Sequence, residues 1–373
     1  MKMKRVTVAV FSLLLLLLFL GYVLPAVFLR DASSEEPLPK PSFSSFSDGD
    51  YQTELNEALS DRILFGSFLL RCKTNIELLS GKREINGVYF AEDTLIDKPT
   101  LPDDKSCALA AGVINQIAQG VKGKTYALFL PTAAQIEEDK LPAYAPREDE
   151  VAVIERLQAH LVPEITVLDS VTPLTSVKNS SFYYHTDPRI TSYGAFTIYN
   201  YNMKSMGFQP ASLNEFNIEY GTRDFYGSLY HRTSYAGVTP DRVDLYHYKT
   251  QSFPVHVVET TAHGTRTRDE LYDRALLQTD DSINALIGEE TLYTQVFAES
   301  RGSKKLLVFA DENIAPFIQF FILHYGQVDI VDINCLGEVD VSLDLSGYDD
   351  VLFCFGLESI NQTDRFSGLG TVC

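Results

Sequence analysis

Short apolar runs that alternate with helical patterns constrain the fold of this chain most strongly. The runs are rich in β-branched and aromatic residues and predict strands at 88–90, 126–130, 165–168, 306–309, 329–332 and 351–355. Apolar residues at three- and four-residue spacing predict helices at 107–119, 150–160, 193–206 and 314–324. Such alternation is typical of an α/β fold with a doubly wound, mainly parallel sheet. In that fold, ligands bind at the carboxyl ends of the strands.

Two further segments complete the predicted domain at 51–373. Residues 51–81 carry apolar side chains at helical spacing and predict one or two amphipathic helices. Residues 207–302 show shorter Tyr- and Phe-rich runs separated by turns. This change of pattern predicts a mixed, β-rich insertion within the domain.

The N-terminal segment predicts attachment to a membrane. Lys2, Lys4 and Arg5 precede an apolar run at 6–29, which is long enough to cross a bilayer and lacks a small-x-small cleavage site. We therefore expect an uncleaved signal anchor within residues 1–30. The positive-inside rule exports everything that follows, and the Ser- and Pro-rich residues 31–50 predict a tether. The expected location is the cell membrane, with the C-terminal domain outside the cytoplasm.

Charge and cysteine usage exclude several classes of function. A net charge of −19 disfavours nucleic acid and anionic lipid as partners. The five cysteines form no CxxC pair, so we expect neither a disulfide framework nor a metal site. No glycine-rich phosphate-binding fingerprint is present, and we expect no cofactor.

Two sequence segments resemble a known family. Residues 183–196, YYHTDPRITSYGAF, resemble the stretch YYRTDHHWTxxGAY that names the DHHW family, and residues 306–313, LLVFADEN, resemble its LLVxKDSY strand and turn. Further similarity lies at 81–89, 130–136, 224–230 and 328–332. The chain thus resembles the SGNH-hydrolase-like DHHW family, which is related to the alginate O-acetylation proteins.

The resemblance implies ester hydrolysis or acetyl transfer on a polysaccharide, by a serine nucleophile and an Asp-x-His pair. Aligned without gaps, this chain keeps the aspartate as Asp187 and the aspartate before the serine as Asp311. Arg189 stands at the histidine position and Glu312 at the serine position. Arginine stays protonated and cannot act as a general base. We therefore expect no Ser–His hydrolysis at this vestigial site.

The two substitutions suggest a specific contact. Serine and histidine are within hydrogen-bonding distance in an active enzyme of this kind. Their replacements Arg189 and Glu312 therefore predict a salt bridge across the site, flanked by Asp187 and Asp311. The alternative is that both are solvent-facing charges. A guanidinium-to-carboxylate distance well beyond about 4 Å would exclude the salt bridge.

Three other residues are candidates for substrate binding. Tyr184 and Tyr226 could stack on sugar rings, although most tyrosines pack in cores. His185 lies two residues before Asp187, on the same face if this stretch is extended, and could restore activity or contact the substrate. The alternative is a structural replacement for the arginine that the family often has at this position.

Three functions remain open at this level. The first is a catalytically silent protein that binds an envelope polysaccharide or a membrane-bound O-acyltransferase. The second is an active polysaccharide O-acetylesterase or O-acetyltransferase with a non-standard catalytic set. The third is a purely structural envelope protein.

Overall fold

A computed structural model describes residues 12–13, 16, 66–177, 181–249, 253–261, 263–287, 291–298, 302–335 and 343–369. The tether and residues 51–65 lie outside these ranges, as does the predicted anchor except for residues 12, 13 and 16. None of the helices in the described ranges is long and apolar enough to span a bilayer. The chain divides into two compact units, Met1–Lys82 with Thr233–Ala236, and Arg83–Arg232 with Gly237–Cys373.

The first unit contains helix α4, Gly66–Leu79. Thr74 is fully buried on this helix, and its hydroxyl donates a hydrogen bond of 2.6 Å to the carbonyl of Thr233. Residues 66–79 fall within the segment where the sequence predicts amphipathic helices.

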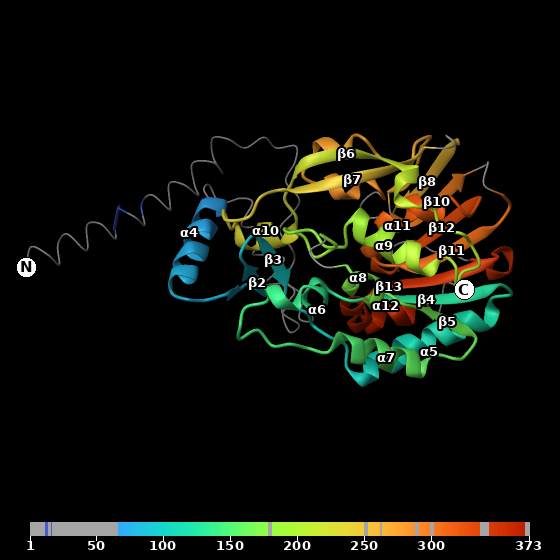
Figure 1. Cartoon of the computed structure of the whole chain (residues 1–373), viewed down its shortest axis with the longest axis horizontal. Coiled ribbons are helices and arrows are strands. Elements are labelled where there is room, and N and C mark those ends of the chain that lie inside the picture. Colours follow the sequence, from blue (N-terminus) through green and yellow to red (C-terminus); the bar gives the residue numbers. More distant parts are fainter. Residues whose placement is uncertain are drawn as a thin grey trace, which may run out of the picture. The chain divides into compact units, whose positions relative to one another are not determined.

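The second unit is a mixed α/β fold with a large eight-stranded sheet (Figure 1). Five neighbouring strands are parallel and follow the order β5 (Ile165–Leu168), β4 (Lys124–Leu130), β13 (Asp350–Gly356), β11 (Lys305–Ala310) and β12 (Gln327–Asp332). The sheet continues antiparallel through β10 (Thr291–Ala298), β8 (Val255–Thr261) and the edge strand β9 (Gly264–Arg268). The strands predicted at 126–130, 165–168, 306–309, 329–332 and 351–355 all lie in the parallel part.

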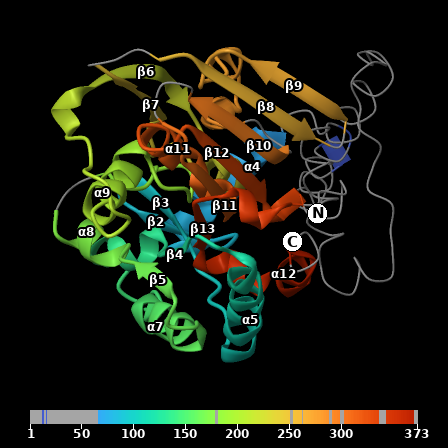
Figure 2. The same cartoon turned by 90° about the vertical axis from the view of Figure 1, so that its right-hand side faces the viewer.

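Helices cover both faces of the parallel strands (Figure 2). One face packs against α5 (Asp104–Gly120), α7 (Glu150–His160) and α12 (Thr363–Leu369). The other packs against α6 (Ala133–Ile136), α8 (Val171–Thr175), α9 (Ser192–Asn202) and α11 (Ala315–Phe321). Along β11, Leu306 and Val308 face the second group of helices while Leu307 and Phe309 face the first. Strands buried on both faces read as continuous apolar runs, which explains why the sequence located them.

Two small sheets lie beside the large one. Strands β1 (Glu84–Ile85), β2 (Val88–Ala91) and β3 (Thr94–Asp97) form an antiparallel sheet, and β6 (Phe216–Phe225) pairs with β7 (Asp241–Tyr248). The strand predicted at 88–90 is therefore not part of the parallel sheet. Asn86 and Gly87 both have positive φ and form the two-residue turn that folds β2 back onto β1.

The segment at 207–302 contributes strands to two sheets. It holds β6 and β7, which pair with each other, and β8, β9 and β10, which extend the large sheet. It also contains the short helix α10, Ser228–Thr233.

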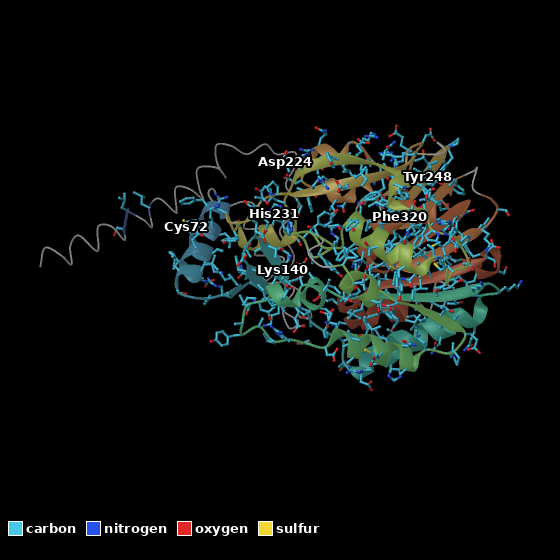
Figure 3. All side chains as sticks on the ribbon, viewed as in Figure 1. Cys72, Lys140, Asp224, His231, Tyr248 and Phe320 are labelled. Atoms are coloured by element: carbon cyan, nitrogen blue, oxygen red, sulfur yellow. The ribbon has the colours of Figure 1, made fainter. Side chains whose placement is uncertain are left out.

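An aromatic cluster fixes α9, α11 and the β6–β7 pair to one another. Phe320 of α11 packs edge-on against Phe216 and Tyr246, with ring centroids 5.6 and 5.3 Å apart, and against Phe196 of α9. Phe320 and Tyr248, which also packs on Phe216, are marked in Figure 3. The cluster thereby fixes the positions of the helices and strands that flank the loops of the candidate site.

Candidate functional site

The carboxyl ends of four parallel strands meet at one edge of the large sheet. Glu312 follows β11 by two residues, Asp332 ends β12, Glu358 follows β13 and Thr132 follows β4. Because these strands are parallel neighbours, the side chains at their ends gather in one place. The edge therefore has a strongly acidic character.

A cavity of about 500 Å³ opens at this edge. All four predicted site positions line it: Asp187, Arg189, Asp311 and Glu312. The structure thus brings together two sequence segments that lie more than a hundred residues apart. A volume of this size is within the range of about 300–1,000 Å³ that is typical of small-ligand pockets.

Asp187 and Arg189 form a buried, two-point ion pair. Arg189 Nε lies 2.7 Å from Asp187 Oδ1, and Nη2 lies 3.2 Å from Oδ2. The Asp187 side chain is only 1 % exposed and also accepts hydrogen bonds from the backbone N–H groups of Arg189 and Ser228. Burial alone would raise the pKa of Asp187, but the adjacent guanidinium and these donors hold it below its usual value. Asp187 is therefore a fixed, charged carboxylate.

The predicted salt bridge between Arg189 and Glu312 is not formed. Among the described residues, no ion pair within 4.0 Å joins the two side chains, because the guanidinium turns back onto Asp187 in its own loop. The remaining Arg189 nitrogen, Nη1, donates to Asn284 Oδ1 at 3.2 Å. Glu312 is exposed and accepts a hydrogen bond of 2.8 Å from Asn334 Nδ2. Arg189 and Glu312 thus line one cavity, with Glu312 left available at its surface.

A tight loop presents Asp187 to the cavity. The loop is closed by an antiparallel bridge between Tyr183 and Ile190. Asp241, which is buried on β7, accepts hydrogen bonds from the N–H groups of His185 and Thr186 and from the Thr186 hydroxyl, at 2.9, 2.8 and 2.6 Å. Three acceptor contacts from one carboxylate fix the loop backbone and thereby the direction of the Asp187 side chain.

Gly227 allows a second segment to approach Asp187 closely. A Cβ atom at this position would lie 2.3 Å from Asp187 Cβ and 2.7 Å from the Thr186 carbonyl oxygen. Only glycine leaves room for this approach. It brings the N–H of Ser228 within 3.1 Å of Asp187 Oδ2.

Asp311 has a structural role at the end of β11. Its side chain is buried and accepts hydrogen bonds from the Gly356 N–H at 2.7 Å, the Ser359 hydroxyl at 2.6 Å and the Asn313 N–H at 3.0 Å. These contacts tie the ends of β11 and β13 together. Burial and the nearby charge of Glu312 raise the pKa of Asp311 to about 6.

Asp332 is a site residue that the sequence reasoning did not single out. It lines the cavity, and burial together with the charges of Glu312 and Asp311 raises its pKa to about 7. The Asn334 N–H donates a 2.7 Å hydrogen bond to it. The rule that places ligands at strand ends could have identified it, because the predicted strand at 329–332 ends on this residue. Asn284 and the exposed Ser228 and His231 also line the cavity. Ser228 lies in the segment of family similarity at 224–230, whereas Asn284 and His231 carried no sequence signal.

The three residues proposed for substrate binding have different positions. Tyr226 lines the cavity and is half-buried, with its ring centroid 4.2 Å from that of Tyr230. Tyr184 also borders the cavity, but its ring is buried and packs edge-on against Phe225, which leaves no face for a sugar ring. His185 is not among the cavity-lining residues. Its Nδ1 lies 3.3 Å from Asp241 Oδ1, a contact that raises the pKa of the imidazole.

The cavity presents groups that can bind hydroxyl groups. Glu312, Asp332 and Asn284 offer oxygen acceptors to the cavity, and Tyr226 offers an aromatic surface. No group of three or more His, Cys, Asp or Glu side chains suited to a metal ion occurs among the described residues. At the two positions that the family resemblance assigns to a histidine and a serine, the chain has a guanidinium and a carboxylate.

Structural comparison identifies several similar folds. A DHHW family protein from Eubacterium siraeum is 17 % identical, with a TM-score of 0.62 over 76 % of this chain and 96 % of that chain. Bacillus cereus PatB1, solved with a sulfonyl adduct, is 15 % identical, with a TM-score of 0.64 over 76 % and 99 % of the two chains. The O-acetyltransferase domain of Pseudomonas putida AlgJ is 12 % identical, with a TM-score of 0.46 over 77 % and 99 %.

Sequence comparison agrees with the fold. No curated protein sequence matches the chain. The family model described as DHHW protein matches residues 71–331, which is more than half of the chain. That span includes the Asp187–Arg189 loop and the acidic end of β11, and it stops one residue before Asp332 at the end of β12. This chain belongs to the DHHW family.

Proposed function

We propose that this protein binds a cell-envelope polysaccharide in its acidic cavity, in a role connected with polysaccharide O-acetylation, and that it does not catalyse Ser–His acyl transfer. The observation that carries the proposal is the buried Asp187–Arg189 ion pair. The family resemblance implies that Asp187 orients a histidine. Here both of its carboxylate oxygens are engaged by an arginine that cannot accept a proton.

The polar lining of the cavity supports glycan binding. Sugars present many hydroxyl donors, and carboxylate oxygens are strong acceptors for them. Glu312 and Asp332 supply such oxygens, while Tyr226 adds an aromatic surface at the same cavity. The link with O-acetylation rests on the resemblance of the two motif segments to that family.

A binding experiment tests the first half of the proposal. Purified protein is applied to an array of bacterial polysaccharides in acetylated and de-acetylated forms. We expect binding to at least one polysaccharide, and we expect Glu312→Gln and Tyr226→Ala to weaken it at least tenfold. Glu155→Gln, which changes an exposed carboxylate of α7 outside the cavity, is the control and should bind normally. Absence of binding to all polysaccharides would favour a purely structural envelope protein.

An activity experiment tests the second half. Wild-type protein and the single variants Arg189→His and Glu312→Ser should not turn over an acetyl ester. The double variant Arg189→His/Glu312→Ser restores the residue types that the family motif requires. The double variant should hydrolyse the ester faster than the wild-type protein and the single variants do, by a factor on the order of 10², because a positioned general base contributes that much. Turnover by the wild-type protein would contradict the proposal.

An active enzyme with a different catalytic set is the second candidate. The observation in its favour is that Ser228 and His231 both line the cavity and that the Ser228 N–H contacts Asp187. However, no hydrogen bond joins the Ser228 hydroxyl to an imidazole within the described part of the chain. His231 Nε2 instead contacts the Tyr226 carbonyl at 3.0 Å. Covalent labelling of Ser228 by a sulfonyl fluoride, abolished by Ser228→Ala, would establish this candidate.

We also propose that residues 6–29 anchor the chain and that the DHHW domain lies outside the cytoplasm. The support is the length of the apolar run and the basic residues that precede it. Protease added to intact cells should digest the domain. Protection until the cells are lysed would exclude this orientation.

A further inference from the structure

Helix α4 exposes an apolar stripe. Phe68, Leu69, Ile76 and Leu79 are 58, 43, 67 and 88 % exposed, and Cys72 is half-buried with a free thiol. At about 100° per residue, these five side chains fall within an arc of about 100°. Soluble helices usually turn a stripe of this width toward a core. In α4 the stripe faces outward.

The opposite side of α4 is the side that is packed. Thr74 lies about 180° from the centre of the stripe, is fully buried and donates its hydroxyl proton to the Thr233 carbonyl. Leu70 and Leu78 lie on either side of Thr74 on this face and are half-buried, so the helix uses one largely apolar face for its contact within the unit and leaves a second apolar face uncovered. An exposed apolar face of this width marks a site for a further partner.

The spacing of the stripe identifies the kind of partner. Leu69, Cys72, Ile76 and Leu79 follow one another at intervals of three, four and three residues, which is the a, d, a, d pattern of a heptad repeat. That pattern packs best against a second helix with the same repeat. A β-branched residue at a with leucine at d, as Ile76 and Leu79 provide, favours a parallel two-stranded coil.

The sequence continues this repeat toward the N-terminus. Leu55, Ala58, Arg62 and Phe65 occupy the preceding a, d, a and d positions, with Arg62 as the one charged residue. A second copy of the chain carries the same repeat in the same register. A lipid surface would not require heptad spacing, and the net charge of −19 opposes approach to anionic lipid.

We propose that α4 pairs in parallel and in register with α4 of a second copy, which makes the protein a dimer through this helix. In a parallel, in-register pair each stripe residue faces its own counterpart. Cys72 (Figure 3) then lies opposite Cys72 of the second copy at a d layer. This contact does not involve the cavity and is independent of the function proposed for it.

The oligomeric state of the full chain, purified in detergent, tests the proposal. Light scattering coupled to size exclusion should give the protein mass of a dimer. Ile76→Glu, which places a charge at an a position, should convert the dimer to a monomer. Tyr144→Glu is the matched control, because Tyr144 is 98 % exposed outside α4, and this variant should remain a dimer. A monomeric wild-type protein, or an Ile76→Glu variant that is still dimeric, would overturn the proposal.

A short bis-maleimide cross-linker tests the register. In a Cys373→Ser background, it should join two chains through Cys72, and Cys72→Ser should abolish the cross-link. Cys107 and Cys354 are buried and should not react. A dimer without this cross-link would exclude the parallel arrangement. A monomer with an unreactive Cys72 would show that the chain's own upstream segment covers the stripe, and a monomer with a reactive Cys72 would show that the stripe is open to a lipid or another protein.

Discussion

Replacing Arg189 by methionine tests whether the Asp187–Arg189 pair stabilises the site as a buried ion pair. Methionine keeps much of the volume of the side chain but removes the guanidinium and its contacts of 2.7 and 3.2 Å to the carboxylate. Asp187, which is 1 % exposed, would then be a buried charge without a partner. The fold depends on this loop, so the change should be measurable as a loss of stability.

The expected loss in free energy of unfolding follows from the burial of the Asp187 carboxylate. Removing one partner of a buried pair costs about 3–5 kcal/mol. Two backbone donors, the N–H groups of Arg189 and Ser228, still contact Asp187. They should limit the loss in free energy of unfolding to about 3 kcal/mol. For a chain of this size that corresponds to a fall in melting temperature of roughly 6 °C. The assay is unfolding of the purified protein followed by circular dichroism.

Arg242→Met is a matched control. Arg242 also contacts an aspartate two residues away at two points, with Nε and Nη2 at 2.6 and 2.7 Å from the Asp244 oxygens. Its side chain is half exposed, however, so the loss should be at most about 1 kcal/mol. Equal losses in Arg189→Met and Arg242→Met would refute the argument that burial makes the Asp187 pair different.

The pH dependence supplies a second criterion. In the wild-type protein the folded-state pKa of Asp187 lies below its unfolded value, so the charged carboxylate adds stability that is lost as the pH falls through the folded pKa. Without Arg189, burial should raise the folded-state pKa above the unfolded value. The stability difference between Arg189→Met and the wild type should therefore shrink between pH 7 and pH 4. A constant or growing difference would contradict this account.

Three further predictions concern the surroundings of the cavity. Gly227→Ala should destabilise the fold by about 1–3 kcal/mol in chemical denaturation, because the added Cβ would lie 2.3 Å from Asp187 Cβ. Gly112→Ala, with open space around it, is the control and should be neutral or stabilising. Asp332→Asn should be more stable than the wild type at pH 8 but not at pH 4. The folded-state pKa of Asp332, about 7, lies above its unfolded-state pKa, so the carboxyl group becomes destabilising as the pH rises from the unfolded-state to the folded-state value. Equal pH profiles of stability for the two proteins would contradict the raised pKa. Asp241→Ala should speed amide hydrogen exchange at Thr186 at least tenfold, because it removes the acceptor of that N–H, and unchanged exchange would show that the loop is held by other contacts.

The parallel strands were predictable because their physical cause is local. Each is buried on both faces and therefore appears in the sequence as a continuous apolar run, as residues 306–309 and 351–355 do. The antiparallel strands β8, β9 and β10 were read only as a β-rich segment, since pairing partners are set by tertiary contacts. The strand at 88–90 was recognised as a strand but assigned to the wrong sheet, because the turn at Asn86 and Gly87 decides its partner.

The proximity of the four candidate residues was predictable, but one predicted contact between them was wrong. The motif segments placed Asp187, Arg189, Asp311 and Glu312 in one site, and the structure places all four around one cavity. The Arg189–Glu312 salt bridge was wrong because a guanidinium binds the nearest well-oriented carboxylate. In this loop that carboxylate is Asp187, two residues away. Asp332 was missed because its role depends on burial beside other acids, which a single sequence does not display.

The two edge strands of the large sheet affect whether this protein aggregates. An open sheet edge can recruit a strand from another chain, and native proteins resist this with short strands and charged side chains. At one edge β5 has four residues. At the other, β9 carries Arg266 and Arg268, which both contact the buried Glu259 of β8 at 2.6 and 2.7 Å. An incoming strand would have to displace these charges, so the edges disfavour aggregation through the sheet.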